Sequence, residues 1–338
     1  SGTLAHRVDL LGTVGNLQLD DNLGAIVTGT YTVSGDLSLK SGLMYLGTLT
    51  MALNGTISYP APGGLLAGNW PSGSSTTLTI NGTGLLGDLK FAPGYQTIAR
   101  INMNRTASGL VNLGSDLTLT GVSGTAMSFT NGRINLGNYN LTLAASATTI
   151  TGTLNNSNHI IADGALGSGK LLKVFSSGTA LSFTYPVGDN SGSAEYTPIT
   201  IASFLPVGGN RTVGVQVFDA DHPQNISGQP NRISRYWRFT DVAGTSSGYT
   251  HTGITLNYIS GASDNVGTLN PTNVQMNLYS NPGSAWAGTL NATSTVTTSQ
   301  AISVAPGTFN QASSPFNNTD ITLRLHSSNT YVWLPTSG

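Results

Sequence analysis

The densest group of oxygen-bearing side chains in the sequence lies at residues 219–225, which include Asp219, Asp221, His222 and Asn225. Calcium binds six to eight oxygen ligands and readily takes them from carboxylates in loops. We therefore predict a structural calcium ion at Asp219 and Asp221, with a solvated turn as the alternative. The five histidines show neither i, i+4 spacing nor an H-x-H pattern, which argues against a zinc site.

Three glycine-containing motifs match known binding or catalytic patterns, but none is followed by the structure that its chemistry needs. Residues 82–87 fit the G-x-G-x-x-G dinucleotide fingerprint, yet Pro-Gly at 93–94 interrupts the helix that should hold the pyrophosphate. Residues 164–170 nearly form a phosphate-binding P-loop, but Leu171 stands where a magnesium-ligating Ser or Thr belongs. Residues 244–248 match the G-x-S-x-G elbow of hydrolases, yet a strand-like segment follows them. We interpret the first motif as chain corners and the second as a flexible interdomain link.

Enzymes that cleave acidic polysaccharides on a β-helix need paired carboxylates, or calcium together with a basic residue. Asp36, Asp88 and Asp116 recur in GDL-type units at multiples of roughly 26 residues, which suits a repeated structural corner better than one catalytic site. The arginines of this region are spread along the sequence with no evident acidic partner: Arg100, Arg105 and Arg133. We therefore predict that the protein is not an enzyme.

The composition predicts an all-β protein that meets neither nucleic acid nor a membrane interior. Charged residues make up 8% of the chain, against about 25% in ordinary globular domains, and Glu195 is the sole glutamate. The residues that normally cover helices are thus replaced by Gly, Ser, Thr and Asn. A net charge of -1 without basic runs offers no electrostatic footprint for nucleic acid, and no apolar run is long enough to span a bilayer. The absence of cysteine suits an exposed, oxidising location.

Hydrophobic residues alternate with small polar ones between Val111 and Leu154, in short runs that Gly, Asn or Asp ends. This period of two predicts strands with one buried face, on which Leu117, Leu119, Leu136 and Leu143 should point inward. Asn-Gly pairs recur at 54–55, 81–82 and 131–132, again at multiples of roughly 26 residues. We therefore predict a parallel β-solenoid of about six coils over residues 1–165, with antiparallel hairpins as the alternative. Residues 59–75, with Trp70, should protrude as a loop.

Longer strands and more aromatic residues follow from about residue 170. Candidate strands are 171–175, 181–187, 197–201, 212–218, 233–240, 253–258, 274–279, 294–298, 301–304 and 320–325. This spacing predicts an antiparallel β-sandwich, Ig-like or jelly-roll-like, over residues 170–326. On 233–240, alternation places Ile233, Arg235, Trp237 and Phe239 on one face. We predict that Trp237 anchors the core and that Arg235 covers its edge.

Two phrases of the sequence are similar to known secreted proteins. The phrase TLTINGTG at 77–84, with ARINMNRTASGLVNLGSDLTLTG at 99–121, resembles the repetitive β-solenoids of large secreted surface proteins of the Bacteroidota. The phrase LSFTYPVGDNSGSAEYTPITI at 181–201, with NRISRYWRFT at 231–240, resembles the β-sandwich module that often follows them. The resemblance implies an exported adhesin, fibre or envelope component, often one that uses type IX secretion.

We therefore predict a non-catalytic structural or adhesive protein of the cell surface that associates with itself or with other surface components. The low charge content gives little repulsion between copies. The tail at 327–338 alternates at Tyr331, Val332, Trp333 and Leu334, so it either folds back or completes a sheet in a neighbouring copy. The alternatives are a glycan-binding module that uses Trp70 and, less favoured, a polysaccharide-degrading β-helix enzyme. Apart from calcium, no cofactor is predicted.

Overall fold

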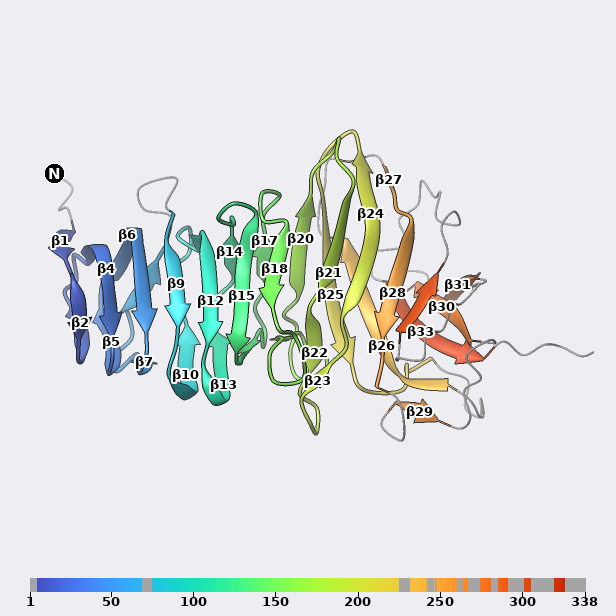
Figure 1. Cartoon of the computed structure of the whole chain (residues 1–338), viewed down its shortest axis with the longest axis horizontal. Coiled ribbons are helices and arrows are strands. Elements are labelled where there is room, and N and C mark those ends of the chain that lie inside the picture. Colours follow the sequence, from blue (N-terminus) through green and yellow to red (C-terminus); the bar gives the residue numbers. More distant parts are fainter. Residues whose placement is uncertain are drawn as a thin grey trace, which may run out of the picture.

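The protein is an elongated all-β molecule in which a stack of short parallel strands leads into longer, mainly antiparallel strands (Figure 1). The computed structural model describes residues 5–68, 75–224, 232–241, 246, 248–259, 264–266, 274–280, 285–290, 301–304 and 319–325. Three predicted features lie outside the described residues: Trp70, the candidate strand at 294–298 and the tail at 327–338. Every element in the described ranges is a strand, as the composition predicted.

The N-terminal half is a parallel β-solenoid, as predicted, and the antiparallel hairpin alternative is wrong. Its first face consists of β1 (His6–Asp9), β2 (Gly12–Val14), β4 (Ala25–Val33), β6 (Leu43–Leu53), β8 (Leu65–Ala67), β9 (Thr77–Ile80), β12 (Arg100–Asn104), β15 (Thr125–Asn131) and β18 (Thr149–Gly152). A second face starts with β3 (Leu17–Asp20), β5 (Asp36–Ser41) and β7 (Thr56–Ser58). It is followed by β10 (Thr83–Leu89), β13 (Thr106–Leu113), β16 (Arg133–Asn135), β19 (Ile160–Ile161) and β22 (Val187–Asp189). The third face holds β11 (Thr97–Ile98), β14 (Leu117–Leu119), β17 (Leu141–Leu143) and β20 (Leu171–Phe175).

The solenoid has about eight turns rather than the six predicted, because its coils differ in length. The first coils are short: Ala25 pairs with Met44, 19 residues later. The longest coil separates Met51 from Leu78, which lie 27 residues apart. A uniform period of roughly 26 residues therefore undercounts the coils. At about 4.8 Å per stacked strand, eight coils extend about 40 Å.

Of the two sequence markers used to count coils, the asparagines mark equivalent positions and the aspartates do not. Asn81 Nδ2 donates to Asn54 Oδ1 over 3.1 Å, and Asn131 Nδ2 donates to Asn104 Oδ1 over 2.9 Å. The GDL aspartates do not stack on one another. Asp36 pairs with Thr56, Asp88 pairs with Asn112, and the Asp116 carboxylate accepts the main-chain N–H of Asn140.

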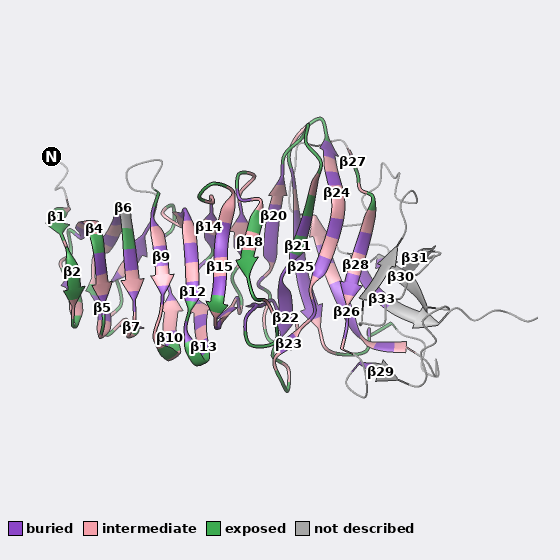
Figure 2. Cartoon of the chain, viewed as in Figure 1, coloured by how far each residue is buried: buried purple, intermediate pink, exposed green. Residues whose placement is uncertain are grey.

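The alternation of side chains fills the solenoid with a continuous hydrophobic core, as the banding of buried and half-buried residues shows (Figure 2). Leu117, Leu119, Leu136 and Leu143 are all buried, which confirms the predicted inward face. Part of the predicted loop at 59–75 also joins the sheet. Leu65–Ala67 forms β8, which pairs in parallel with β6.

The third face of the solenoid continues into the second half of the molecule without a break. Strand β20 pairs in parallel with β17 on one side and antiparallel with β25 (Arg211–Phe218) on the other. Beyond β25 the sheet continues through β26 (Arg232–Asp241), β33 (Thr319–Leu325), β30 (Val274–Ser280) and β31 (Ala285–Leu290), with β29 (Asn265–Val266) beside β26. The solenoid's second face likewise ends in an antiparallel hairpin, β22 with β23 (Glu195–Tyr196).

A separate antiparallel sheet packs against this extended sheet. It consists of β21 (Leu181–Tyr185), β24 (Ile199–Val207), β28 (Gly253–Asn257) and β32 (Ala301–Val304), with β27 (Gly248–Thr250) beside β24. Phe175 of β20 lies 4.4 Å from Phe204 of β24 between ring centroids, so the two sheets meet through aromatic side chains. Trp237 is fully buried, as predicted, and its Nε1 donates to the carbonyl of Thr197.

Candidate functional site

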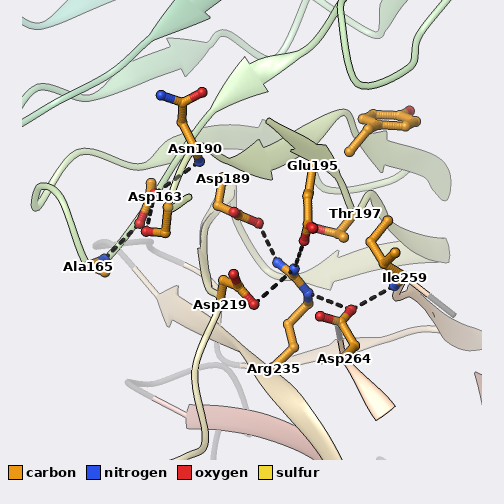
Figure 3. Close-up of polar contacts among 12 residues, drawn as sticks. Asp163, Ala165, Asp189, Asn190, Glu195, Thr197, Asp219, Arg235, Ile259 and Asp264 are labelled. Atoms are coloured by element: carbon orange, nitrogen blue, oxygen red, sulfur yellow. Dashed lines mark hydrogen bonds and ion pairs between the residues drawn. The ribbon is translucent and has the colours of Figure 1, made fainter. Parts of the chain in front are cut away.

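The most unusual side-chain cluster of the described residues surrounds Arg235, where the solenoid meets the later sheets (Figure 3). Arg235 lies on β26 and Asp189 ends β22, the last parallel strand of the solenoid's second face. The guanidinium donates through Nη1 to Asp189, through Nη2 to Glu195 and to Asp219 (3.3 Å), and through Nε to Asp264 (2.9 Å). One arginine therefore joins carboxylates from four separate segments of the chain. The predicted role of Arg235 as a cover over the Trp237 edge misses this network.

The cluster holds more negative charge than Arg235 can neutralise. Arg235, Asp189 and Asp264 have no exposed surface, and Glu195 is also buried. Four ionised carboxylates and one guanidinium would leave a net charge of -3 in a site with little solvent. Burial raises the pKa of Asp189 to about 7 against the opposing pull of Arg235, and burial likewise raises the pKa values of Glu195 and Asp219. The site therefore favours taking up protons near neutral pH.

Three of these carboxylates could also hold a metal ion. Asp189, Glu195 and Asp219 each offer an oxygen atom within 4.8 Å of the other two. The guanidinium of Arg235 already donates to all three, so it takes the place of a cation in this arrangement. Although burial by itself lowers the pKa of Arg235, its hydrogen bonds and the surrounding negative charges raise it overall. The arginine therefore keeps its charge.

The predicted calcium pair, Asp219 and Asp221, faces two different arginines. Asp219 contacts Arg235, whereas Asp221 accepts hydrogen bonds from Nε and Nη2 of Arg232, the first over 2.8 Å. His222 turns away from both aspartates and contacts Asp320 over 3.1 Å. Calcium would have to replace an arginine at each carboxylate, and the calcium site stays a prediction.

Asp163 fixes the segment that follows Asp189. Its Oδ2 accepts the main-chain N–H of Asn190 over 3.0 Å and the hydroxyl of Ser191 over 2.8 Å, and its Oδ1 accepts the N–H of Ala165 (Figure 3). The side chain of Asn190 is thereby placed so that its Oδ1 accepts a hydrogen bond from Arg133 Nη1 over 2.8 Å. Arg133 belongs to a second candidate site.

This second site is a pocket of about 470 Å³ on the corner between the first and second faces of the solenoid. Three successive coils line it with residues 105–109, 131–133 and 156–158, and Ala194 of the β22–β23 hairpin adds one further contact. The lining contains Arg105 and Arg133 but no acidic residue. The sequence analysis treated these arginines as spread out, because it did not place positions 105, 131 and 157 in line across coils. The spacing of 26 residues that relates these positions was the available signal.

The glycine motifs form chain corners and turns. Gly82 has a φ of 88° at the turn into β10, and a Cβ there would meet the carbonyl oxygen of Asn54 at 1.9 Å. The interpretation of residues 82–87 as corners is thus confirmed at Gly82, whereas Gly87 lies within β10, in its irregular pairing with β13. Strand β10, rather than a helix, follows the turn.

The P-loop-like segment 164–170 is a turn held firmly on the preceding coil, so its interpretation as a flexible interdomain link is wrong. Gly169 N donates to Gly137 O over 2.8 Å, and Lys170 N donates to Asn140 Oδ1 over 3.0 Å. Ser168 N donates to Asn138 Oδ1. These amides are used internally and form no phosphate cradle. Leu171 begins strand β20, as the sequence indicated.

The hydrolase-like motif at 244–248 also lacks its required context. The hydroxyl of Ser246 accepts a hydrogen bond from Arg211 and donates one to the carbonyl of Gly248, over 3.1 and 3.0 Å. Strands β27 and β28 follow it, as predicted, where the hydrolase elbow requires a helix. Nothing in this geometry activates the hydroxyl as a nucleophile.

Comparison with known proteins adds no identity. No protein-family model, curated protein or solved structure matches the chain. In the part of the chain that the structure describes, no helix is long and apolar enough to cross a membrane.

Proposed function

We propose that this protein is a non-catalytic structural or adhesive component of a cell surface or extracellular fibre, in which the solenoid acts as a rigid spacer. The observation that carries the proposal is the position of β20. One side of this strand belongs to the solenoid ladder and the other to the antiparallel sheet. A hydrogen-bonded sheet therefore runs from the coils into the later strands, and the two parts move as one stiff body.

The use of buried charge supports a structural role. Arg235 donates to carboxylates, and Arg238 makes two hydrogen bonds to Asp320. Arg105 and Lys173, also buried, donate to main-chain carbonyls instead. In each case the cation ties together chain segments far apart in sequence. These contacts hold the fold in a single arrangement rather than presenting a reactive group to a substrate.

The N-terminal coil supports self-association. Strand β1 pairs with β4 on one side, and among the described residues no strand pairs with its other edge. Leu11 is 81% exposed, and Val8, Leu10 and Leu17 line an apolar cavity of about 160 Å³ at this coil. An open edge beside apolar surface is a template for another strand.

A second copy suits this edge because strand β1 is complementary to itself. If two copies of β1 pair antiparallel about Val8, each Arg7 lies opposite an Asp9 of the other copy. Both side chains are well exposed, so both are free to form the cross-strand pairs. The resulting particle would be a rod of twice the length.

Electron microscopy and sedimentation velocity test the proposal. We expect rods at low concentration, and dimers or longer assemblies as the concentration rises. A protein that stays monomeric at high concentration would end the self-association proposal. Turnover of any polysaccharide that is lost on mutating a described acidic residue would overturn the non-catalytic role in favour of the β-helix enzyme. The glycan-binding alternative based on Trp70 lies outside the described residues, but the polar pocket favours glycan binding at a different place.

A further inference from the structure

We propose that the pocket across residues 105–109, 131–133 and 156–158 binds an anionic sugar unit, with Arg133 as the partner of its carboxylate or sulfate group. This inference goes beyond the structural role proposed above, and either can fail without the other. It depends on the charge of the pocket, on the polar groups around it and on its size.

The charge of the pocket is unbalanced. Two arginines line it without an acidic residue, in a chain whose net charge is -1. Arg105 has its guanidinium turned toward earlier coils, where it donates to the carbonyls of Asn81, Gly84, Leu85 and Gly55. Carbonyl oxygens satisfy its hydrogen bonds but do not cancel its charge. The corner therefore stays electropositive.

Arg133 is the group that can pair with a ligand. Its one hydrogen bond among the described residues is to the neutral amide of Asn190, and no described carboxylate forms an ion pair with it. Glu195, beside the lining residue Ala194, is turned to Arg235. Partial burial lowers the pKa of Arg133, which means that its charge is poorly compensated. A planar guanidinium with free N–H groups is well suited to a bidentate oxyanion.

The rest of the lining suits sugar hydroxyls. Ser108, Asn156 and Ser157 are exposed, and Asn131 is half-buried. These hydroxyl and amide groups come from successive coils, so they form a row along the solenoid axis. Ala107 and Ser108 also have left-handed φ values of 50° and 57°, a conformation that costs non-glycine residues energy and that often marks binding sites.

The size of the pocket favours a sugar over a free inorganic anion. At about 470 Å³ the pocket falls within the range of small-molecule sites, about 300–1,000 Å³. A lone sulfate or phosphate would fill a small part of it and leave the row of hydroxyl and amide groups unused. A saccharide that carries a carboxylate or sulfate uses both features at once.

The test is calorimetric titration of the full chain with two matched pairs of probes. Polygalacturonate oligosaccharides are compared with their methyl esters, which differ by loss of the charge, and sulfated dextran fragments are compared with dextran. We expect one anionic member to bind and its neutral counterpart not to bind. The pair that responds distinguishes a carboxylate ligand from a sulfate ligand.

Two variants locate the binding. Arg133→Gln removes the cation. Asn156→Asp places a negative charge in the pocket, while its oxygen can still accept the N–H of Tyr196. Each should weaken binding at least tenfold. Arg7→Gln makes the same charge change as Arg133→Gln at an exposed residue of β1, and it should leave the affinity unchanged. Thermal melts confirm that each variant is folded.

Three results would overturn the inference. The first is the absence of saturable binding of both anionic probes at millimolar concentration. The second is binding that Arg133→Gln and Asn156→Asp leave intact, or that Arg7→Gln weakens equally, since the contact would then be non-specific. The third is inorganic sulfate or phosphate binding as tightly as the saccharides, which would make the pocket a simple anion site.

Discussion

Arg235 and Asp189 form an ion pair in which neither side chain has exposed surface, and the pair links the central strand β26 to the solenoid strand β22. A buried pair of this kind adds little stability over a well-packed apolar pair, but removing one partner leaves an uncompensated charge. The pair therefore makes the junction depend on every member of its network.

Arg235→Gln should destabilise the protein strongly, because it leaves four carboxylates in the cluster without their cation. We expect a loss of about 3–5 kcal/mol in the free energy of unfolding, measured with chemical denaturant. Arg232→Gln is the matched control, since Arg232 pairs with the well-exposed Asp221. That change should cost less than about 1 kcal/mol. Equal small losses for both variants would contradict the junction's role.

The stability of the protein should fall as the pH rises through neutrality. The pKa of Asp189 is about 7 in the folded protein and 3.8 at its ordinary value, so the folded state binds more protons between these limits. Its contribution is therefore full at acidic pH and is lost as the pH rises through 7, by about 1.4 kcal/mol per pH unit for one full proton. Raised pKa values at Glu195 and Asp219 act in the same direction.

Denaturation between pH 5 and 9 checks this slope, and Asp189→Asn should flatten it. Buried His159 acts in the opposite direction, because burial, with help from the charge of Arg133, lowers its pKa to about 4. Its contribution is present above its ordinary pKa of 6.5 and is lost as the pH falls toward 4. The decline above pH 6.5 thus belongs to the carboxylates. A wild-type protein that grows more stable from pH 6.5 to 8 would refute the prediction.

Leu119→Asp should destabilise the solenoid by several kcal/mol, because it buries an unpaired charge in the core. Its neighbour Thr118 points outward and stacks between Thr97 and Thr142. Thr118→Asp should therefore cost less than about 1 kcal/mol in the same denaturation experiment. Similar costs for the two variants would count against the inward face described here.

Charge reversal should break and then restore the proposed pairing of two β1 strands. Asp9→Arg sets arginines opposite one another across the two copies, so sedimentation velocity should show weakened association. The double variant Arg7→Asp with Asp9→Arg reverses both charges and should recover it. Association that neither change affects would exclude this edge as the contact.

The sequence predicted those features that depend on neighbouring residues or on a repeated marker. Period-two alternation located the strands and the buried leucines, and Asn54, Asn81 and Asn131 mark equivalent positions. The coil number came out too low because the early coils are shorter and the aspartate marker is not equivalent between coils.

The candidate sites could not be read in the same way. The carboxylates around Arg235 come from positions 189, 195, 219 and 264, and no local pattern relates them. Alternation correctly placed Arg235 on the inner face, but it cannot identify the ions that such a residue meets. The pocket was more accessible, because Arg105, Asn131 and Ser157 follow the coil spacing that the Asn-Gly pairs already suggested.

The unequal coils have a mechanical consequence. Their strands lie across the long axis, so tension applied between the two ends loads the hydrogen bonds of one coil before those of the next. Coils of 19 to 27 residues would then peel away singly, each releasing about 65–95 Å of chain. A tether of this kind lengthens in steps under load and dissipates energy at each step while the remaining coils stay folded.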